Sequence, residues 1–154
     1  MKRKRKLAMV TALLVLGMVA LGGCGGNSGG GNRLTKEEFA TKANALCSDY
    51  MLKTAALPNS KTEAEGVKVL ADMRDFFAQS IAGMKKLKPP TAEQAAVNRV
   101  ITLADKRLAV MSQSVTALQK RDLKKVTALT NRVGALKKES NLLFGQLGAT
   151  TCVM

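Results

Sequence analysis

Histidine and tryptophan are both absent from this chain of 154 residues. Without histidine, the chain lacks the commonest general base and the commonest ligand of transition metals. Helical bundles that bind haem or two metal ions use His or Glu-x-x-His motifs on facing helices, so they are excluded in that form. The chain also contains no Cys-x-x-Cys pair, no glycine-rich phosphate loop and no aspartate-rich calcium loop.

Paired methionines could in principle bind haem. Met73, Met84 and Met111 lie at helical spacing on apolar stripes, however, and a core role is expected for methionine there. We therefore predict no bound cofactor and no metal.

Arrangements of side chains that support catalysis are missing as well. A serine nucleophile would need lysine as its base, and no Ser-x-x-Lys spacing occurs. Glu37 and Glu38 fall in the first turn of a predicted helix, where capping and the helix dipole explain them. Asp105 lies beside Lys106 and Arg107, on a face expected to be solvated. Because acid–base catalysis needs a positioned and tuned group, we predict that the protein is not an enzyme.

Aromatic residues are scarce, at four Phe and one Tyr. Proteins that bind single-stranded nucleic acid combine aromatic side chains with positive charge, and most aromatic residues here fall on predicted core stripes. No predicted helix concentrates Arg, Asn and Gln on one face in a DNA-reading pattern. No nucleic-acid partner is expected.

The N-terminus has the pattern of a signal peptide. Five basic residues within Met1–Lys6 precede an apolar stretch from Leu7 to Leu21, and small residues then lead to Cys24. A membrane span needs roughly 20 apolar residues, so an uncleaved anchor with an incidental cysteine is the less favoured alternative.

The run Leu21-Gly22-Gly23-Cys24 resembles the lipobox of bacterial lipoproteins. The resemblance implies that residues 1–23 are a cleaved signal peptide and that the sulfur of Cys24 carries the lipid, such as palmitate chains. Two acyl chains are sufficient for stable anchoring. We therefore predict a lipid anchor and a location on the outer face of the cytoplasmic membrane.

Residues 24–33 contain almost only Gly, Ser and Asn after the cysteine, with no apolar side chain to bury. This composition is typical of a flexible tether, which leaves residues 34–154 as the folded domain.

Cysteine content limits the possible cross-links. If Cys24 carries lipid, only Cys47 and Cys152 remain, and export would place them in an oxidising compartment. We predict a disulfide between them, closing a loop of about 100 residues. A pair of free thiols is the alternative.

Four segments of the domain carry a helical hydrophobic period, and none alternates like a strand. Capping signals mark the predicted starts: Thr35 with Glu38, Thr62 with Glu65, Thr91 with Gln94, and Asp122. Pro58, Pro89-Pro90 and Gly148 mark predicted ends. The third segment shows one stripe: Val97, Ile101, Ala104, Leu108, Met111, Val115 and Leu118. Four such helices joined by short turns predict an all-α, up-down four-helix bundle.

Several of these features together resemble small helical lipoproteins of actinobacteria, a largely uncharacterised family. The likeness rests on the lipobox, the tether, the sequence of residues 34–47, Pro89-Pro90 and the Gly148–Cys152 ending. It implies a helical fold and a location in the cell envelope, and no activity.

Net charge is the main remaining functional signal. The chain has 25 Lys and Arg against 11 Asp and Glu, and the excess after residue 23 is still +9. One cluster, Lys85, Lys86 and Lys88, is predicted to face the membrane at the turn between the second and third helices. The other cluster, Lys120, Arg121, Lys124 and Lys125, is predicted to point outward at the next turn and attract an anionic partner. Ordinary cations at helix C-termini are the alternative explanation for both clusters.

Two functions of different classes fit these features. The first is a non-enzymatic interaction module of the cell envelope that binds an anionic polymer or a protein. The second is a carrier or sensor that holds a small apolar ligand between its helices, since flexible Met51, Met73, Met84 and Met111 could pack around a guest.

Overall fold

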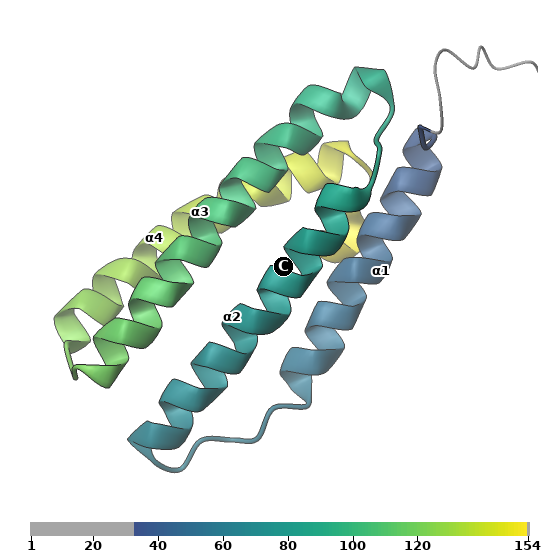
Figure 1. Cartoon of the computed structure of the whole chain (residues 1–154). Helices are drawn as coiled ribbons and strands as arrows, with labels where there is room; N and C mark the ends of the chain where they lie inside the picture. Colours follow the sequence, from purple (N-terminus) through teal and green to yellow (C-terminus); the bar gives the residue numbers. More distant parts are fainter. Residues whose placement is uncertain (1–32, 154) are drawn as a thin grey trace, which may run out of the picture.

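The computed structural model describes residues 33–153 as a four-helix bundle (Figure 1). The long helices are α1 (Lys36–Ala55), α2 (Glu63–Lys86), α3 (Gln94–Gln119) and α4 (Leu123–Gln146), and consecutive helices run in opposite directions. Two single 3-10 turns, η1 (Thr91–Glu93) and η2 (Thr150–Cys152), precede α3 and follow α4. No strand occurs in this range. The predicted all-α, up-down architecture is confirmed.

The predicted signal peptide, Cys24 and nearly all of the predicted tether lie outside the described residues. Within residues 33–153, no helix combines the length and the apolar character that crossing a bilayer requires.

Local side-chain caps explain where α1 and α2 begin. The hydroxyl of Thr35 accepts a hydrogen bond from the backbone N–H of Glu38, and the Glu38 carboxylate accepts one from the Thr35 N–H. Thr62 and Glu65 repeat this capping box at α2. Each box satisfies backbone N–H groups that have no partner inside the helix.

The start of α3 differs from its prediction. Thr91 does not form a capping box with Gln94 but begins the turn η1, and no side chain caps α3. The backbone N–H of Glu93 instead donates to the carbonyl of Pro90. The two prolines therefore fix the entry to α3 through a tight 3-10 turn rather than through a side-chain cap.

Gly148 ends α4 and reverses the chain. Its φ of 75° is a left-handed conformation that glycine adopts without steric cost. The N–H of Ala149 donates to the carbonyl of Phe144 at 2.9 Å and that of Gly148 to Gly145 at 3.1 Å, which together form a Schellman motif. This turn directs the last residues back along the bundle.

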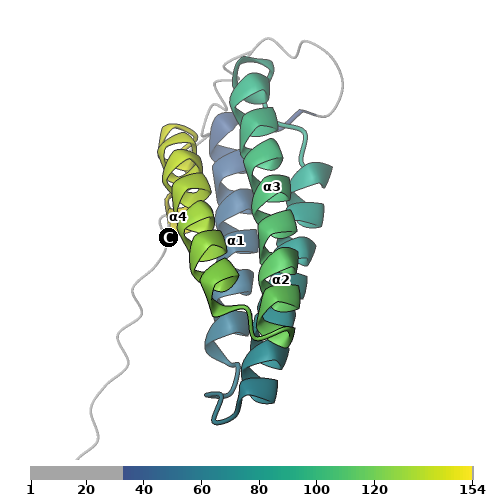
Figure 2. The same cartoon turned by 90° about the vertical axis from the view of Figure 1, so that its left-hand side faces the viewer.

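The returning segment closes one side of the bundle. Helix α1 packs on α2, α2 on α3 and α3 on α4. Figure 2 shows the four helices from the side on which α3 and α4 lie in front. Helices α1 and α4 are bridged mainly by η2. A disulfide joins Cys152 in η2 to Cys47 in α1, as predicted, with Cα atoms 5.2 Å apart and a sequence separation of 105. The N–H of Thr151 also donates to the side-chain carbonyl of Asn44 at 2.8 Å.

Helix α1 buries one stripe at helical spacing, made of Phe39, Ala43, Cys47 and Tyr50. The predicted stripe of α3 is too narrow. Because α3 packs against both α2 and α4, it also buries Val100, Leu103, Val110 and Ala117, which lie beside the predicted stripe.

Candidate functional site

The described chain enters the bundle at the turn between α2 and α3. The N–H of Leu34 donates to the carbonyl of Lys88 at 2.9 Å, and the Arg33 guanidinium donates to the carbonyl of Pro89 at 2.8 Å. The first basic cluster therefore lies beside the point of entry, and the second lies at the opposite end, after α3.

At the entry end, one further lysine lies beside the predicted basic cluster, and a carboxylate balances the charge of one predicted member. Lys85 forms an ion pair with Asp105 of α3 at 2.8 Å. Lys86 and Lys88 line a shallow hollow together with Lys42 of α1, and none of these three has a carboxylate partner among the described residues. The sequence pattern missed Lys42 because only the packing of α1 on α2 brings it to this end.

At the opposite end, Lys120, Arg121, Lys124 and Lys125 are all exposed. The Arg121 guanidinium pairs with the Glu63 carboxylate at the start of α2, 3.0 Å away. Lys120 caps the C-terminus of α3, so the helix dipole favours its charge.

The dipole does not explain the other two lysines of this cluster. Lys124 and Lys125 lie in the first turn of α4, which contains no acidic residue. The N-terminus of a helix carries partial positive charge, so each lysine there destabilises the helix slightly. The alternative explanation as helix C-terminal cations is therefore wrong for Lys124 and Lys125.

A small, mainly apolar cavity of about 40 Å³ lies inside the bundle. All four helices and η2 contribute to its wall, including the disulfide, Tyr50, Phe77, Met84 and Phe144. Of the methionines predicted to pack around a guest, Met84 lines the cavity. Met51 is 38% exposed and is not a core residue, because it lies off the buried face of α1.

Arg107 is the one arginine in the wall of this cavity. Its guanidinium carbon lies 4.5 Å from the centroid of the Phe77 ring, and its buried Nε has no hydrogen-bond partner. No carboxylate in residues 33–153 pairs with it. Burial lowers the pKa of Arg107, because the charged form is poorly solvated.

The solvated face predicted for Arg107 is wrong. Arg107 is three positions after Ala104 and four before Met111, which places it on the stripe that faces α2. This spacing was the sequence signal for an inward position. The two charged residues before it, Asp105 and Lys106, are both exposed, so residue type alone does not distinguish the inward position of Arg107 from theirs.

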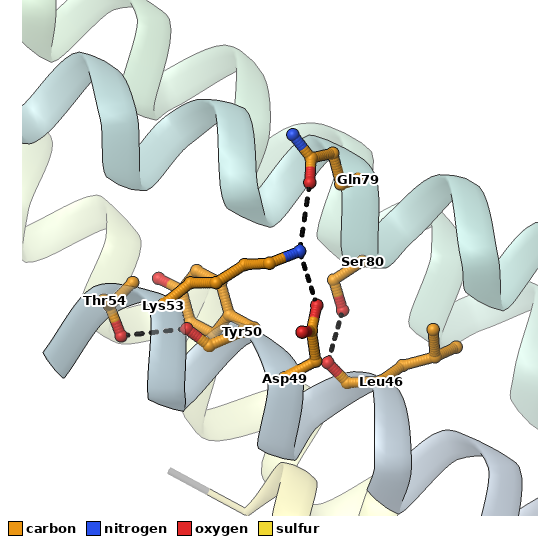
Figure 3. Close-up of polar contacts among 7 residues, drawn as sticks. All are labelled: Leu46, Asp49, Tyr50, Lys53, Thr54, Gln79 and Ser80. Atoms are coloured by element: carbon orange, nitrogen blue, oxygen red, sulfur yellow. Dashed lines mark hydrogen bonds and ion pairs between the residues drawn. The ribbon is translucent and has the colours of Figure 1, made fainter. Parts of the chain in front are cut away.

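Polar contacts join α1 and α2 beside Tyr50 (Figure 3). The ammonium of Lys53 lies 2.8 Å from the Asp49 carboxylate and donates to the Gln79 side-chain oxygen at 3.3 Å. The hydroxyl of Ser80 donates to the Leu46 carbonyl across the same interface. The Tyr50 ring, one turn away, packs 5.6 Å from the ring of Phe77, measured between centroids.

Tyr50 offers a direct spectroscopic test of this environment, because it is the only tyrosine in the chain. Burial raises the pKa of its phenol above the ordinary value of 10.0, and nearby Arg107 opposes that shift less strongly. An ultraviolet absorbance titration should show ionisation above 10.0, and Arg107→Met should raise the pKa further. A midpoint at or below 10.0 in the native protein would contradict the buried position of the ring.

The raised pKa of Tyr50 makes the stability of the fold depend on pH. Because the folded-state pKa of Tyr50 is raised, its contribution to stability is present below the unfolded pKa of 10.0 and is lost as pH rises through the folded pKa.

No group of three metal-ligating His, Cys, Asp or Glu side chains gathers among residues 33–153. No protein-family model, curated protein or solved structure matches the chain. The resemblance to actinobacterial lipoproteins therefore stays a prediction from the sequence.

Proposed function

We propose that this protein is a membrane-anchored, extracytoplasmic lipoprotein that acts without catalysis and presents its bundle to an anionic partner in the cell envelope. One observation carries the proposal: the chain enters the bundle at one end, and the exposed basic cluster lies at the other. The 26 residues of α3 separate the two ends by about 39 Å. A lipid on Cys24 would thus hold the entry end near the membrane and direct Lys120, Arg121, Lys124 and Lys125 outward.

The placement of two of these lysines supports a role in binding. Lysine in the first turn of a helix costs roughly 0.3–1 kcal/mol at an exposed site, so Lys124 and Lys125 do not serve the stability of α4. Their charges lie close to that of Lys120, and only Arg121 is paired. This end of the bundle would attract a phosphate-rich wall polymer or an acidic protein surface.

The entry end would contribute to membrane association. Each lysine near an anionic leaflet contributes about 1 kcal/mol, and Lys42, Lys86 and Lys88 have no ion pair within the described residues that would reduce this effect. Lys85 would contribute less, because Asp105 already balances its charge.

Replacement of Lys120, Arg121, Lys124 and Lys125 by glutamine should weaken binding to an anionic polymer about tenfold. The measurement uses the full chain in nanodiscs of zwitterionic lipid and a poly(glycerol phosphate) polymer, over a series of salt concentrations. The thermal midpoint should change little, because the gain from removing Lys124 and Lys125 from the start of α4 offsets the loss of the Lys120 charge at the end of α3 and of the Arg121–Glu63 pair.

The matched control removes the same number of charges at the opposite end, by replacing Lys42, Lys85, Lys86 and Lys88 with glutamine. It should leave polymer binding nearly unchanged. Equal weakening by both variants would show that net charge alone attracts the polymer, and unchanged binding by the first would refute the proposed partner surface.

A second candidate function is a carrier of a small ligand held between the helices. The apolar cavity in the bundle, with its flexible Met84 wall, is the observation that favours it.

A further inference from the structure

The cavity contains a charge that the fold itself does not balance. The Arg107 guanidinium lies on the Phe77 ring, its Nε has no hydrogen-bond partner, and the surrounding wall is mainly apolar. Arg107 is partly buried, and a cation removed from water is ordinarily paired, since the loss of its hydration is costly. The contact with one aromatic ring compensates only part of that cost.

The hydroxyl groups in the cavity wall provide no further hydrogen-bond donors for an anion that carries more than one negative charge. Ser80 donates to the Leu46 carbonyl and Ser140 donates to the Lys137 carbonyl, so both protons are already used. One guanidinium, with its buried Nε unpartnered, beside a space of about 40 Å³ suits a small monoanionic group. A carboxylate has that size and charge, and its planar shape matches guanidinium.

The side of the cavity formed by α4 can accommodate an apolar tail. Only Leu129 and Ser140 of α4 are fully buried, while Phe144 is half-buried and lines the cavity. Helix α4 packs on α3 over the most extensive helix interface of the bundle but reaches α1 mainly through η2, so a tilt of α4 away from α1 that keeps the α3 interface would break few contacts. The neighbouring Met84 side chain can change rotamer to follow the guest.

We propose that Arg107 binds the carboxylate of a single-chain amphiphile, such as a free fatty acid, with the alkyl chain between α4 and α1. This inference rests on the carrier function and is independent of the exposed basic cluster. The carboxylate occupies the existing cavity, and the alkyl chain separates α4 from α1.

The test uses the full chain in phosphatidylcholine nanodiscs with two photoreactive probes, a diazirine-bearing palmitic acid and the corresponding long-chain alcohol. After irradiation, mass spectrometry of peptides identifies the labelled segments. The acid should label segments around Arg107, Met84 and Phe144, and the alcohol should label them about tenfold less. Unlabelled palmitic acid should compete, and unlabelled alcohol should not.

Arg107→Met keeps an unbranched apolar stem and removes the charge, and Arg132→Met is the matched control on the exposed face of α4. Labelling by the acid should fall about tenfold in the first variant and stay unchanged in the second. The thermal midpoint of Arg107→Met should not fall, because a poorly solvated charge is removed.

Equal labelling by acid and alcohol in the native protein would overturn the assignment of Arg107 while leaving a carrier of apolar molecules. Undiminished labelling of Arg107→Met by the acid would overturn it as well. Absence of label from all cavity segments with both probes would refute the carrier function itself.

Discussion

Replacement of Cys152 by serine should lower the free energy of unfolding by about 4 kcal/mol. The disulfide to Cys47 spans 105 positions, and a cross-link over such a loop restricts the unfolded chain strongly. A domain of this size is stable by only about 5–15 kcal/mol, so the variant would be close to unfolding. Guanidinium chloride denaturation of the full chain, followed by far-ultraviolet circular dichroism, measures the change.

Loss of the disulfide should also loosen the folded structure, in addition to its effect on the entropy of the unfolded chain. Leu147, Ala149 and Cys152 are each at most 2% exposed and lie in or beside the segment that bridges α1 and α4. Release of η2 from α1 would expose this apolar surface. We therefore expect the loss of stability to be accompanied by exposure of the cavity and an increase in the mobility of α4.

The control is a chain with both Cys47 and Cys152 replaced by alanine, which should lose as much stability as the native chain does under reductant. Reductant should then have no effect on the double variant. A native chain that loses less than about 1 kcal/mol on reduction would contradict this account of the cross-link.

Replacement of Cys24 by serine should abolish covalent acylation of the protein. The lipobox-like run ending at Cys24 predicts that its sulfur carries the lipid, and a serine hydroxyl cannot form the thioether bond. Cells grown with an alkyne-bearing fatty acid provide the measurement, with the label detected on a denaturing gel so that only covalently attached acyl chains are counted.

The matched control is Cys152→Ser, which changes a cysteine to serine at the other end of the chain. It should retain the full acyl label while losing stability. Acyl label that persists in Cys24→Ser would refute the predicted attachment site.

Local signals in the sequence predicted much of the fold because they act within a few residues. The Thr35 and Thr62 capping boxes and the Gly148 turn each depend on contacts inside one helical turn or one reversal. The disulfide was predictable for a different reason: lipidation of Cys24 would leave only one possible pair.

The candidate sites were harder to predict because they depend on packing between distant segments. Lys42 joins the entry-end cluster only because α1 lies against α2, and the second buried stripe of α3 exists only because α4 covers it. Asp105 becomes the partner of Lys85 across the interface of α2 and α3. None of these contacts is indicated by a hydrophobic period or a motif spacing in the sequence.

Arg107 and the pair Lys124 and Lys125 are different, since the chain did contain their signals. Arg107 lies at helical spacing from Ala104 and Met111, and Asp122 as a helix start already places both lysines in a first turn. Their charges favoured a solvated face for Arg107 and allowed a helix C-terminal position for the two lysines. The spacing was the better guide, because helix geometry determines which face a side chain occupies.

The central claim is that the protein functions as a lipid-anchored module outside the membrane, and an intact mass tests it most directly. The protein is extracted from its own membranes in mild detergent and measured without reduction. The account predicts the mass of a chain that begins at Cys24, reduced by two hydrogens for the Cys47–Cys152 disulfide and increased by a lipid with two acyl chains. The mass of the uncleaved chain from Met1, with no acyl addition, would contradict it.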